Sequence, residues 1–494
     1  MPSRAGGNQE FSDAPLLNEY LKGIEDDGDE HEDLKQRVWN ESKKLWHIVG
    51  PAIFSRLASY SIIVITQSFA GHLGDLELAA FSISNNLVVG FDIGLLLGMA
   101  SALETLCGQA FGAKEYYMLG VYLQRSWIVL LGCCVLLLPL YLFASPVLKL
   151  LGQPEDIAEL SGVVTLWMIP LHFSMAFQFP LQRFLQSQLK NAVIAWVSLA
   201  ALGVHLVLCW VFVYGFKLGV VGITVILNFS WWVLVIGMFG YSVSGGCPLS
   251  WTGFSIEAFS GLWDFIKLSA SSGLMICLEN WYYKVLILMT GNLENAKIAL
   301  DALSICMTIN SWEIMIPFAF FAATGVRVAN ELGAGNGKGA KFAAIVAVMT
   351  SLAIGIFLCL LVGIFHDKVG FIFSTSQPVL EAVNHLSVLL AFTILLNSVQ
   401  PVLSGVAVGS GWQAQVAYIN LACYYLVGVP IGLLGGWVFH QGVKGIWAGM
   451  IFGGAAVQTL ILTIITLRCD WDKEAHKATM HVKKWAGSAT HGDH

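Results

Sequence analysis

The sequence predicts an all-α membrane protein with twelve transmembrane helices in two pseudo-symmetric six-helix bundles. Composition, the spacing of apolar runs and an internal repeat lead to this prediction. Hydrophobic residues make up 56% of the 494 residues and charged residues only 12%, whereas about 25% is usual for a soluble domain. Because so few charges cannot cover so large an apolar core, a lipid bilayer is the expected solvent. The net charge of -6 offers no phosphate-neutralising surface, so we expect no nucleic-acid partner.

Apolar segments long enough to cross a bilayer alternate with clusters of polar residues, glycine and proline. A hydrocarbon core about 30 Å thick needs roughly 20 mainly apolar residues for each helical crossing. Divided at these clusters, the chain gives spans at 45–70, 78–110, 117–147, 159–186, 191–214, 218–243, 263–291, 299–331, 340–365, 380–408, 414–438 and 444–467.

The two halves of the chain resemble each other at a nearly constant offset. Six short matches recur in order at shifts between 220 and 223, among them Gly112 with Gly333 and Pro180 with Pro401. Because six spans is an even number, the second half enters the membrane in the same direction as the first. Two such bundles can rock about their interface and open a central cavity to either face in turn, which is typical of a carrier.

The charged residues predict the orientation and the limits of the domains. Placing both termini in the cytosol puts nineteen of the 26 lysines and arginines on that side and five on the other, as the positive-inside rule requires. The first 33 residues hold ten acidic residues and two basic ones, which is typical of a disordered tail and not of a secretory leader. We expect a disordered acidic cytosolic tail at 1–44, an N-terminal six-helix lobe at 45–243, an inter-lobe linker at 244–262, a C-terminal six-helix lobe at 263–468 and a cytosolic tail at 469–494.

Glu279 is the leading candidate for a functional residue. A charge at the bilayer centre costs on the order of 3 kcal/mol, so acidic residues inside spans are functional candidates. Glu279 lies roughly 22 Å along the helix from Asp264, well inside the membrane. Desolvation disfavours a charged carboxylate, so this group could load and release a proton. Lys284 lies about 140° around the helix, which is poor geometry for an ion pair with Glu279.

Other polar and aromatic residues of the second half are candidates with open alternatives. Lys284 could pair with Glu313 or Asp301 on the next span, or face the cavity and attract anionic or phenolic cargo. Aromatic residues there could stack a flat ligand or simply pack. The candidates for the substrate cavity are Asn280, Trp281, Lys284, Asn310, Glu313, Asn397 and Gln400.

A third group of residues is expected to serve structure or gating. Glu104 lies roughly 15 Å before Lys114 along its helix, near the cytosolic end, so a structural or gating role is favoured over substrate contact. Pro180 and Pro401 occupy equivalent repeat positions and are hinge candidates, with a static kink as the alternative. Asp301 belongs to the same group. Ten cysteines are scattered without paired spacing, so neither disulfides nor a metal site is expected.

Four segments carry a family resemblance that covers about 45–468. The chain resembles the plant branch of the multidrug and toxic compound extrusion (MATE, or DETOXIFICATION) transporters. The segments are Glu104-Thr-Leu-Cys-Gly-Gln-Ala-Phe-Gly-Ala, Cys277-Leu-Glu279-Asn-Trp281, Arg327-Val-Ala-Asn330-Glu331-Leu-Gly-Ala-Gly-Asn336 and Gln400-Pro-Val-Leu-Ser-Gly-Val-Ala-Val-Gly-Ser-Gly-Trp412-Gln.

The resemblance implies proton-driven export of organic compounds through a fold of two six-helix lobes. By this resemblance, Glu279 matches the acid of the seventh helix assigned to proton coupling and substrate binding. Lys284 stands where animal relatives carry a second acid, and Asn397 where many relatives have an acid in the tenth helix. These departures favour neutral, phenolic or anionic cargo over organic cations.

The leading hypothesis is therefore a monomeric proton-coupled antiporter in the vacuolar or plasma membrane. Its partners would be protons, the lipid bilayer and a small organic substrate, a xenobiotic or a secondary metabolite such as a flavonoid. An anion channel or uniporter of the same fold is the alternative, motivated by Lys284 and the missing acids. A lipid flippase is weaker, because no basic headgroup groove is apparent. No nucleotide loop, metal cluster or nucleophile constellation appears, so no enzymatic activity, cofactor or metal is predicted.

Overall fold

The computed structural model describes residues 34–216, 218–291, 296–365, 368 and 376–489. Residues 1–33, which hold the predicted acidic tail, lie outside the described residues. The chain divides into two compact units, Met1–Lys44 and Leu45–His494. Of the first unit only 34–44 is described, and it begins a helix rather than continuing the predicted tail. All that follows concerns the second unit.

Helices make up nearly all of the described chain, and no strand occurs within those residues. The first half contains α2 (Leu34–Leu73), α3 (Asp75–Ile83), η3 (Ser84–Val89), α4 (Gly90–Gly112), α5 (Tyr116–Leu142), α6 (Ala144–Leu150), α7 (Glu155–Trp167), α8 (Ile169–Ser187), α9 (Asn191–Trp210), η4 (Val211–Gly215), α10 (Gly219–Tyr241) and η5 (Ser242–Gly246).

The second half follows a short connection that includes η6 (Ile256–Phe259). It contains α11 (Leu262–Thr290), α12 (Ala296–Glu313), α13 (Met315–Gly333), α14 (Gly337–Ile364), α15 (Gln377–Asn397), α16 (Gln400–Ser410), α17 (Gln413–Asn420), η8 (Leu421–Gly428), α18 (Val429–Leu433), η9 (Leu434–Val438), α19 (Gly442–Met450), η10 (Ile451–Ala455), α20 (Ala456–Arg468) and α21 (Trp471–Ala489).

The number of membrane-crossing helices agrees with the predicted twelve. Within the described residues, ten helices are long and apolar enough to cross a bilayer, and the bent pair of α7 and α8 makes eleven. The 29 residues of α11 are also long enough. Glu279 and Lys284 lie in the middle of α11 and lower its mean hydropathy. Helix α11 is therefore the twelfth span by its length, although its composition alone does not qualify it.

Several spans are broken, and the breaks do not all fall where the prolines predicted. The fourth span bends by 48° between α7 and α8, at Met168, whereas Pro180 lies inside the unbroken helix α8. In the tenth span, Pro401 stands in the first turn of α16, directly after the break between α15 and α16. Proline fits the first turn of a helix because its missing N–H has no helical acceptor there.

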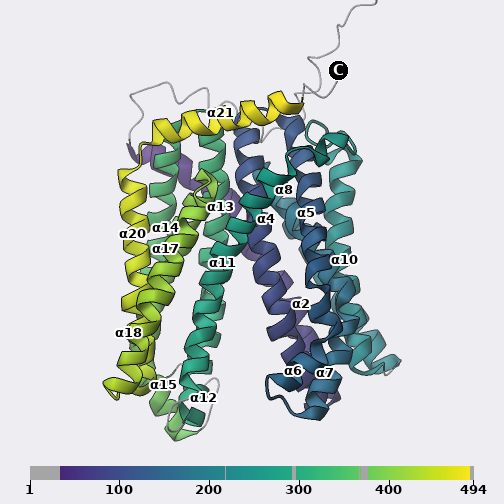
Figure 1. Cartoon of the computed structure of the whole chain (residues 1–494), viewed down its shortest axis with the longest axis vertical. Coiled ribbons are helices and arrows are strands. Elements are labelled where there is room, and N and C mark those ends of the chain that lie inside the picture. Colours follow the sequence, from purple (N-terminus) through teal and green to yellow (C-terminus); the bar gives the residue numbers. More distant parts are fainter. Residues whose placement is uncertain (1–33, 217, 292–295, 366–367, 369–375, 490–494) are drawn as a thin grey trace, which may run out of the picture. The chain divides into compact units, whose positions relative to one another are not determined.

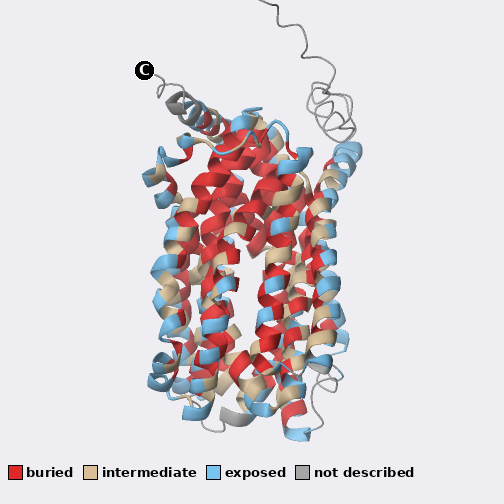
Figure 2. Ribbon diagram, turned by 90° about the vertical axis from the view of Figure 1, so that its right-hand side faces the viewer, coloured by how far each residue is buried: buried red, intermediate tan, exposed pale blue. Residues whose placement is uncertain are grey.

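The main seam between the two halves is formed by α4 against α11 and α13, and α2 adds a buried cluster against α13. Every residue of α4 from Gly98 to Phe111 is buried. Figure 2 shows that buried residues gather toward the upper end of the helices in that view. A Cβ atom on Gly98 would lie 2.8 Å from the Cα of Gly273 on α11, so the two backbones touch. Glycine permits this approach, which is typical of tightly packed membrane helices.

The turn between α13 and α14 is held by the polar residues of the motif at 327–336. Arg327 Nη2 donates to Glu331 Oε1 at 2.7 Å, and Asn336 Nδ2 donates to Glu331 Oε2 at 2.9 Å. Asn336 Oδ1 accepts from the backbone N–H of Gly339 at 2.8 Å and so caps α14. This motif therefore builds the turn between α13 and α14.

Helix α21 lies across the ends of α13 and α14 (Figure 1). Trp471, Ala475 and Ala478 are buried in a cluster with side chains of α13, α14 and α16. Apolar residues at 471, 475, 478 and 482 fall on one helical face, with charged residues on the other. Sequence analysis assigned 469–494 to a tail and so missed this amphipathic helix.

Candidate functional site

Glu279 lies on α11 and faces the interior of the second half. Its Oε1 accepts hydrogen bonds from Ser404 Oγ on α16 at 3.1 Å and from Asn420 Nδ2 on α17 at 3.1 Å. Gln400 also interacts with this carboxylate. The side chain is partly buried, and no ion pair among the described residues involves it. Glu279 is therefore neither exposed to acyl chains nor neutralised by a neighbouring cation.

The groups around Glu279 are neutral amides and hydroxyls that hold one another in place. Gln458 Nε2 donates to Asn420 Oδ1 at 3.0 Å, which orients the Asn420 amide so that its Nδ2 points at Glu279. Gln400 Nε2 donates to Ser404 Oγ at 3.2 Å. Such a shell solvates a carboxylate with dipoles alone, so the net negative charge of an ionised Glu279 stays uncompensated.

A second polar cluster joins α11, α12 and α15. Asn397 Nδ2 donates to Asn310 Oδ1 at 2.9 Å and to Glu313 Oε2 at 3.4 Å. Tyr283 OH donates to Asn397 Oδ1 at 3.1 Å. Glu313, Asn310 and Asn397 were predicted to line an open cavity, but they are only 8%, 6% and 3% exposed. In this conformation they are packed inside the second half.

The remaining cavity candidates lie on the face of α11 that meets α4. A Cβ on Gly94 of α4 would lie 3.7 Å from Asn280 Nδ2, and the ring of Trp281 packs edge-on to Phe91 at 6.0 Å. Lys284 follows one turn later on the same face and is exposed. It makes no ion pair with Glu313 or with Asp301 in the part of the chain that the structure describes. Of the two alternatives for Lys284, the geometry favours an unpaired side chain.

Glu104 forms a buried ion pair at the seam. Its Oε2 lies 2.9 Å from Nη1 of Arg183 on α8, and both side chains are at most 2% exposed. A second cation, Arg56 of α2, interacts with the same two groups, and a Cβ on Gly325 of α13 would collide with the Glu104 carboxylate. Glu104 is thus held by neighbours on α2, α8 and α13, and its structural or gating role stays a prediction.

The first half contains a buried acid–imidazole cluster that sequence analysis missed. His172 Nδ1 lies 2.5 Å from Asp92 Oδ2, and Tyr141 OH donates to the same oxygen at 2.7 Å. His172 Nε2 donates to the carbonyl of Cys134 at 2.9 Å. All three side chains are fully buried. Each residue could have been noticed as an ionisable group inside a span. Their pairing could not be predicted, because Asp92 and His172 lie 80 residues apart in the sequence.

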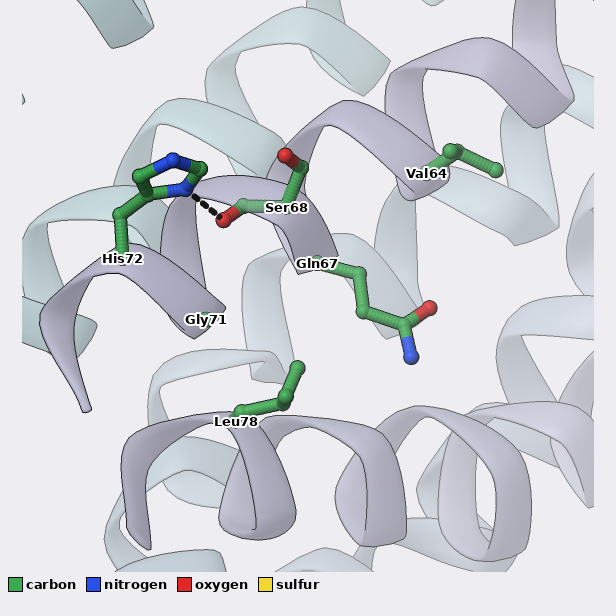
Figure 3. Close-up of a pocket in the computed structure, with 6 residues that line it drawn as sticks. All are labelled: Val64, Gln67, Ser68, Gly71, His72 and Leu78. Carbon is green, nitrogen blue, oxygen red and sulfur yellow. Dashed lines mark hydrogen bonds between the residues drawn. The ribbon is translucent and has the colours of Figure 1, made fainter. Parts of the chain in front are cut away.

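A surface hollow on the first half is lined by other residues (Figure 3). It measures about 420 Å³ and contains none of the candidate site residues. Its lining residues come from the end of α2 and the start of α3, and they are Val64, Gln67, Ser68, Gly71, His72 and Leu78. This hollow therefore adds nothing to the candidate site.

A twelve-span helical chain, duplicated in sequence and carrying an uncompensated carboxylate within its second half, defines a multi-pass membrane transporter of the carrier class. The chain belongs to the MatE family. The family model matches it twice, at residues 51–211 and 272–434, so the second match is displaced by 221 residues at its start and 223 at its end. The internal repeat found in the sequence at shifts of 220 to 223 is thereby confirmed.

Similar proteins and structures agree with this assignment. The chain is 66% identical to Protein DETOXIFICATION 27 of Arabidopsis thaliana over 98% of this chain and 99% of that protein. Protein DETOXIFICATION 26 of the same organism is 65% identical, with coverage of 98% and 99%. The crystal structure of the eukaryotic MATE transporter AtDTX14 matches 90% of this chain and 99% of that chain, with a TM-score of 0.85 and 36% identity.

More distant structures share the fold. The Vibrio cholerae MATE transporter VcmN in the bent form has a TM-score of 0.75 at 17% identity and covers 91% of this chain and 99% of that one. The plant MATE resemblance and the twelve-helix fold are thus confirmed. The protein is a multi-pass integral membrane transporter of the efflux type, which handles small organic substrates and is not an enzyme.

Proposed function

We propose that this transporter is a proton-coupled antiporter that exports organic compounds from the cytosol, with Glu279 as its proton carrier. The hydrogen-bonded but uncompensated carboxylate of Glu279 supports this proposal. An ionised Glu279 is stabilised by Ser404 and Asn420, while burial without a cation favours a protonated one. Because the two effects oppose each other, a proton gradient can decide which form is present.

Protonation of Glu279 would change contacts among three helices. The ionised carboxylate accepts charge-assisted hydrogen bonds from α16 and α17. A protonated carboxyl becomes a donor itself and loses that charge, so these bonds weaken. Helix α11 also forms the seam with α4. A change in how α11 packs would therefore reach the interface about which the two halves rock.

The topology and the cargo site are part of the same proposal. The end that α21 covers would face the cytosol, with an N-terminal lobe at 45–243, a linker at 244–262 and a C-terminal lobe at 263–468. The buried half of α4 would then close the cytosolic side in this conformation. Asn280, Trp281 and Lys284 would contact cargo, and the exposed lysine favours neutral, phenolic or anionic compounds. One chain holds both lobes, so a monomer suffices.

Purified protein in proteoliposomes with an imposed pH gradient tests the role of Glu279. Wild-type protein should accumulate cargo from a panel of phenolic and anionic compounds in a pH-driven manner. Glu279→Gln should abolish pH-driven uptake and still exchange labelled for unlabelled cargo, because glutamine mimics the neutral acid. Glu155→Gln, which changes an exposed carboxylate, serves as the matched control. Undiminished pH-driven uptake by folded Glu279→Gln protein would refute the assignment.

An anion channel or uniporter is the second candidate, because Lys284 is exposed and unpaired within the described residues. Planar-bilayer recordings separate the two functions. Large currents that ignore the proton gradient would favour the channel, whereas saturable, pH-coupled flux would favour the antiporter.

A further inference from the structure

We propose that Glu313 is a second proton-carrying carboxylate, so that each transport cycle moves two protons. This inference rests on the proposed antiport and specifies its stoichiometry. Glu313 was a candidate for cargo contact from the sequence, but the structure buries it to 8% exposure. A carboxyl group with so little exposed surface can exchange a proton more readily than it can touch an organic substrate.

Glu313 lies at a short interruption inside a continuous span, not at a free helix end. Glu313 is the last residue of α12, and its partner Asn397 is the last residue of α15. Helical hydrogen bonds continue past Glu313, because the N–H of Ile314 donates to the carbonyl of Asn310 at 2.9 Å and the N–H of Phe318 donates to that of Ile314 at 3.0 Å. The case for a neutral Glu313 therefore depends on its burial and its own hydrogen bonds.

The hydrogen bonding of Glu313 also fits a neutral carboxyl better than a charged one. Oε2 accepts a single long bond of 3.4 Å from Asn397, and Oε1 is buried without a hydrogen-bond partner among the described residues. No ion pair in that part of the chain includes Glu313. An unpartnered carboxylate oxygen in a poorly hydrated site costs several kcal/mol. A proton on Oε1 removes most of that cost.

The groups that face Glu313 come from three helices. Asn310 of α12 and Asn397 of α15 are neutral. Tyr283 of α11 interacts with both Glu313 and Glu279, and its hydroxyl is bonded to Asn397. Tyr283, one helical turn after Glu279, therefore lies close to both acids and joins their surroundings through one side chain.

The location of Glu313 links its protonation to the packing of two helices. Helices α12 and α15 pack against each other, and Glu313 and Asn397 meet where they end. The chemical step is simple: an O–H bond forms at Oε1 when the proton arrives from the side opposite the cytosol, and the same bond breaks when the proton leaves to the cytosol. No electron transfer is involved. Loss of the proton would leave a charge on an oxygen that has no hydrogen-bond partner among the described residues, so the packing of α12 against α15 would change.

Proteoliposomes containing the full chain test the stoichiometry. With the membrane potential clamped at zero and a neutral cargo from the panel, the cargo gradient at zero net flux gives the proton number. Each pH unit supports about a tenfold cargo gradient for one proton and about a hundredfold gradient for two. We expect about a hundredfold for wild type and about tenfold for Glu313→Gln. Glu381→Gln, which changes an exposed acid of α15, should stay at about a hundredfold.

The outcomes separate this inference from the function on which it rests. A wild-type gradient of about tenfold, or a Glu313→Gln gradient that stays near a hundredfold, would overturn the role of Glu313 and leave the antiport intact. A wild type without any response to pH would overturn the antiport itself. If Glu313→Gln does not fold, Glu313→Asp keeps a titratable acid and should retain the hundredfold gradient. Infrared spectroscopy of wild type should show two protonated carboxyl bands that disappear on alkalinisation, and one band alone would contradict the proposal.

Discussion

Replacing Gly98 with alanine should shift the protein away from the conformation described above, because the α4 seam leaves no room for a methyl group. The new Cβ would lie 2.8 Å from the Cα of Gly273, 3.1 Å from the carbonyl oxygen of Ser272 and 3.2 Å from that of Gly273. Carbon atoms in contact prefer roughly 3.5 to 4.0 Å, so the helices must part by roughly 0.7 Å. All three close neighbours are backbone atoms, which cannot rotate away.

The expected magnitude follows from the cost of overpacking. An extra methyl group in a tightly packed interior costs typically about 1 to 3 kcal/mol. We call the conformation described above seam-closed, and one in which α4 and α11 have separated at Gly98 seam-open. The extra methyl group then raises the free energy of the seam-closed conformation alone. The equilibrium between the two conformations would then shift by roughly 5- to 150-fold toward the seam-open one.

Distances between spin labels measure this shift. Cysteines introduced at Glu115 and Lys338 place labels at exposed positions near the ends of α4 and α14, one in each half. The ten native cysteines are buried or only partly exposed, so labelling is selective. Gly98→Ala should enlarge the long-distance population. The matched control is Gly132→Ala on α5, where a Cβ would meet nothing within 4 Å. A folded Gly98→Ala protein with the wild-type distance distribution would refute the claim that the seam opens.

Three further substitutions follow from the same contacts. Asp92→Asn should lower the free energy of unfolding by about 3 to 5 kcal/mol, as expected when one partner of a buried pair is removed, and adding His172→Gln should recover part of the loss in denaturant titrations. Trp471→Ala should cost about 3 to 5 kcal/mol of local stability by emptying the cluster under α21, seen as faster hydrogen exchange in α21, while Met480→Ala at an exposed site should change nothing. Lys284→Gln should weaken binding of an anionic cargo by roughly tenfold, the loss of one charge-assisted hydrogen bond, and leave binding of a neutral analogue unchanged; equal losses for both would contradict the assigned charge recognition.

The spans and the repeat were predictable because their signals are local in the sequence. Hydropathy encodes each crossing within its own residues, and duplicated glycines and prolines preserve the offset between halves. The bend of the fourth span was not predictable in the same way. A proline inside a membrane helix is tolerated when its neighbours satisfy the freed carbonyl, and those neighbours are tertiary, so the chain bends at Met168 and stays helical at Pro180.

The candidate site was predictable in part for a similar reason. Glu279 stands out because carboxylates are rare inside membrane spans. Its partners Ser404 and Asn420 do not, since hydroxyls and amides are common there and the hydrogen bonds cross 125 and 141 residues of sequence. The burial of Glu313 likewise depends on how α12 and α15 pack. The many charged and polar residues of α21 are typical of a solvated tail. Its apolar residues at 471, 475, 478 and 482 nevertheless have the spacing of one helical face.

The docking of α21 has a consequence for how the protein is made. Its residues leave the ribosome after the membrane spans have been synthesised, yet Trp471 completes a hydrophobic cluster whose other members come from α13, α14 and α16. Until α21 has been synthesised, that cluster stays open at the membrane surface. A premature stop codon just after Arg468 would therefore yield a fully inserted chain with an uncovered apolar patch, a target for cellular quality control rather than a working transporter.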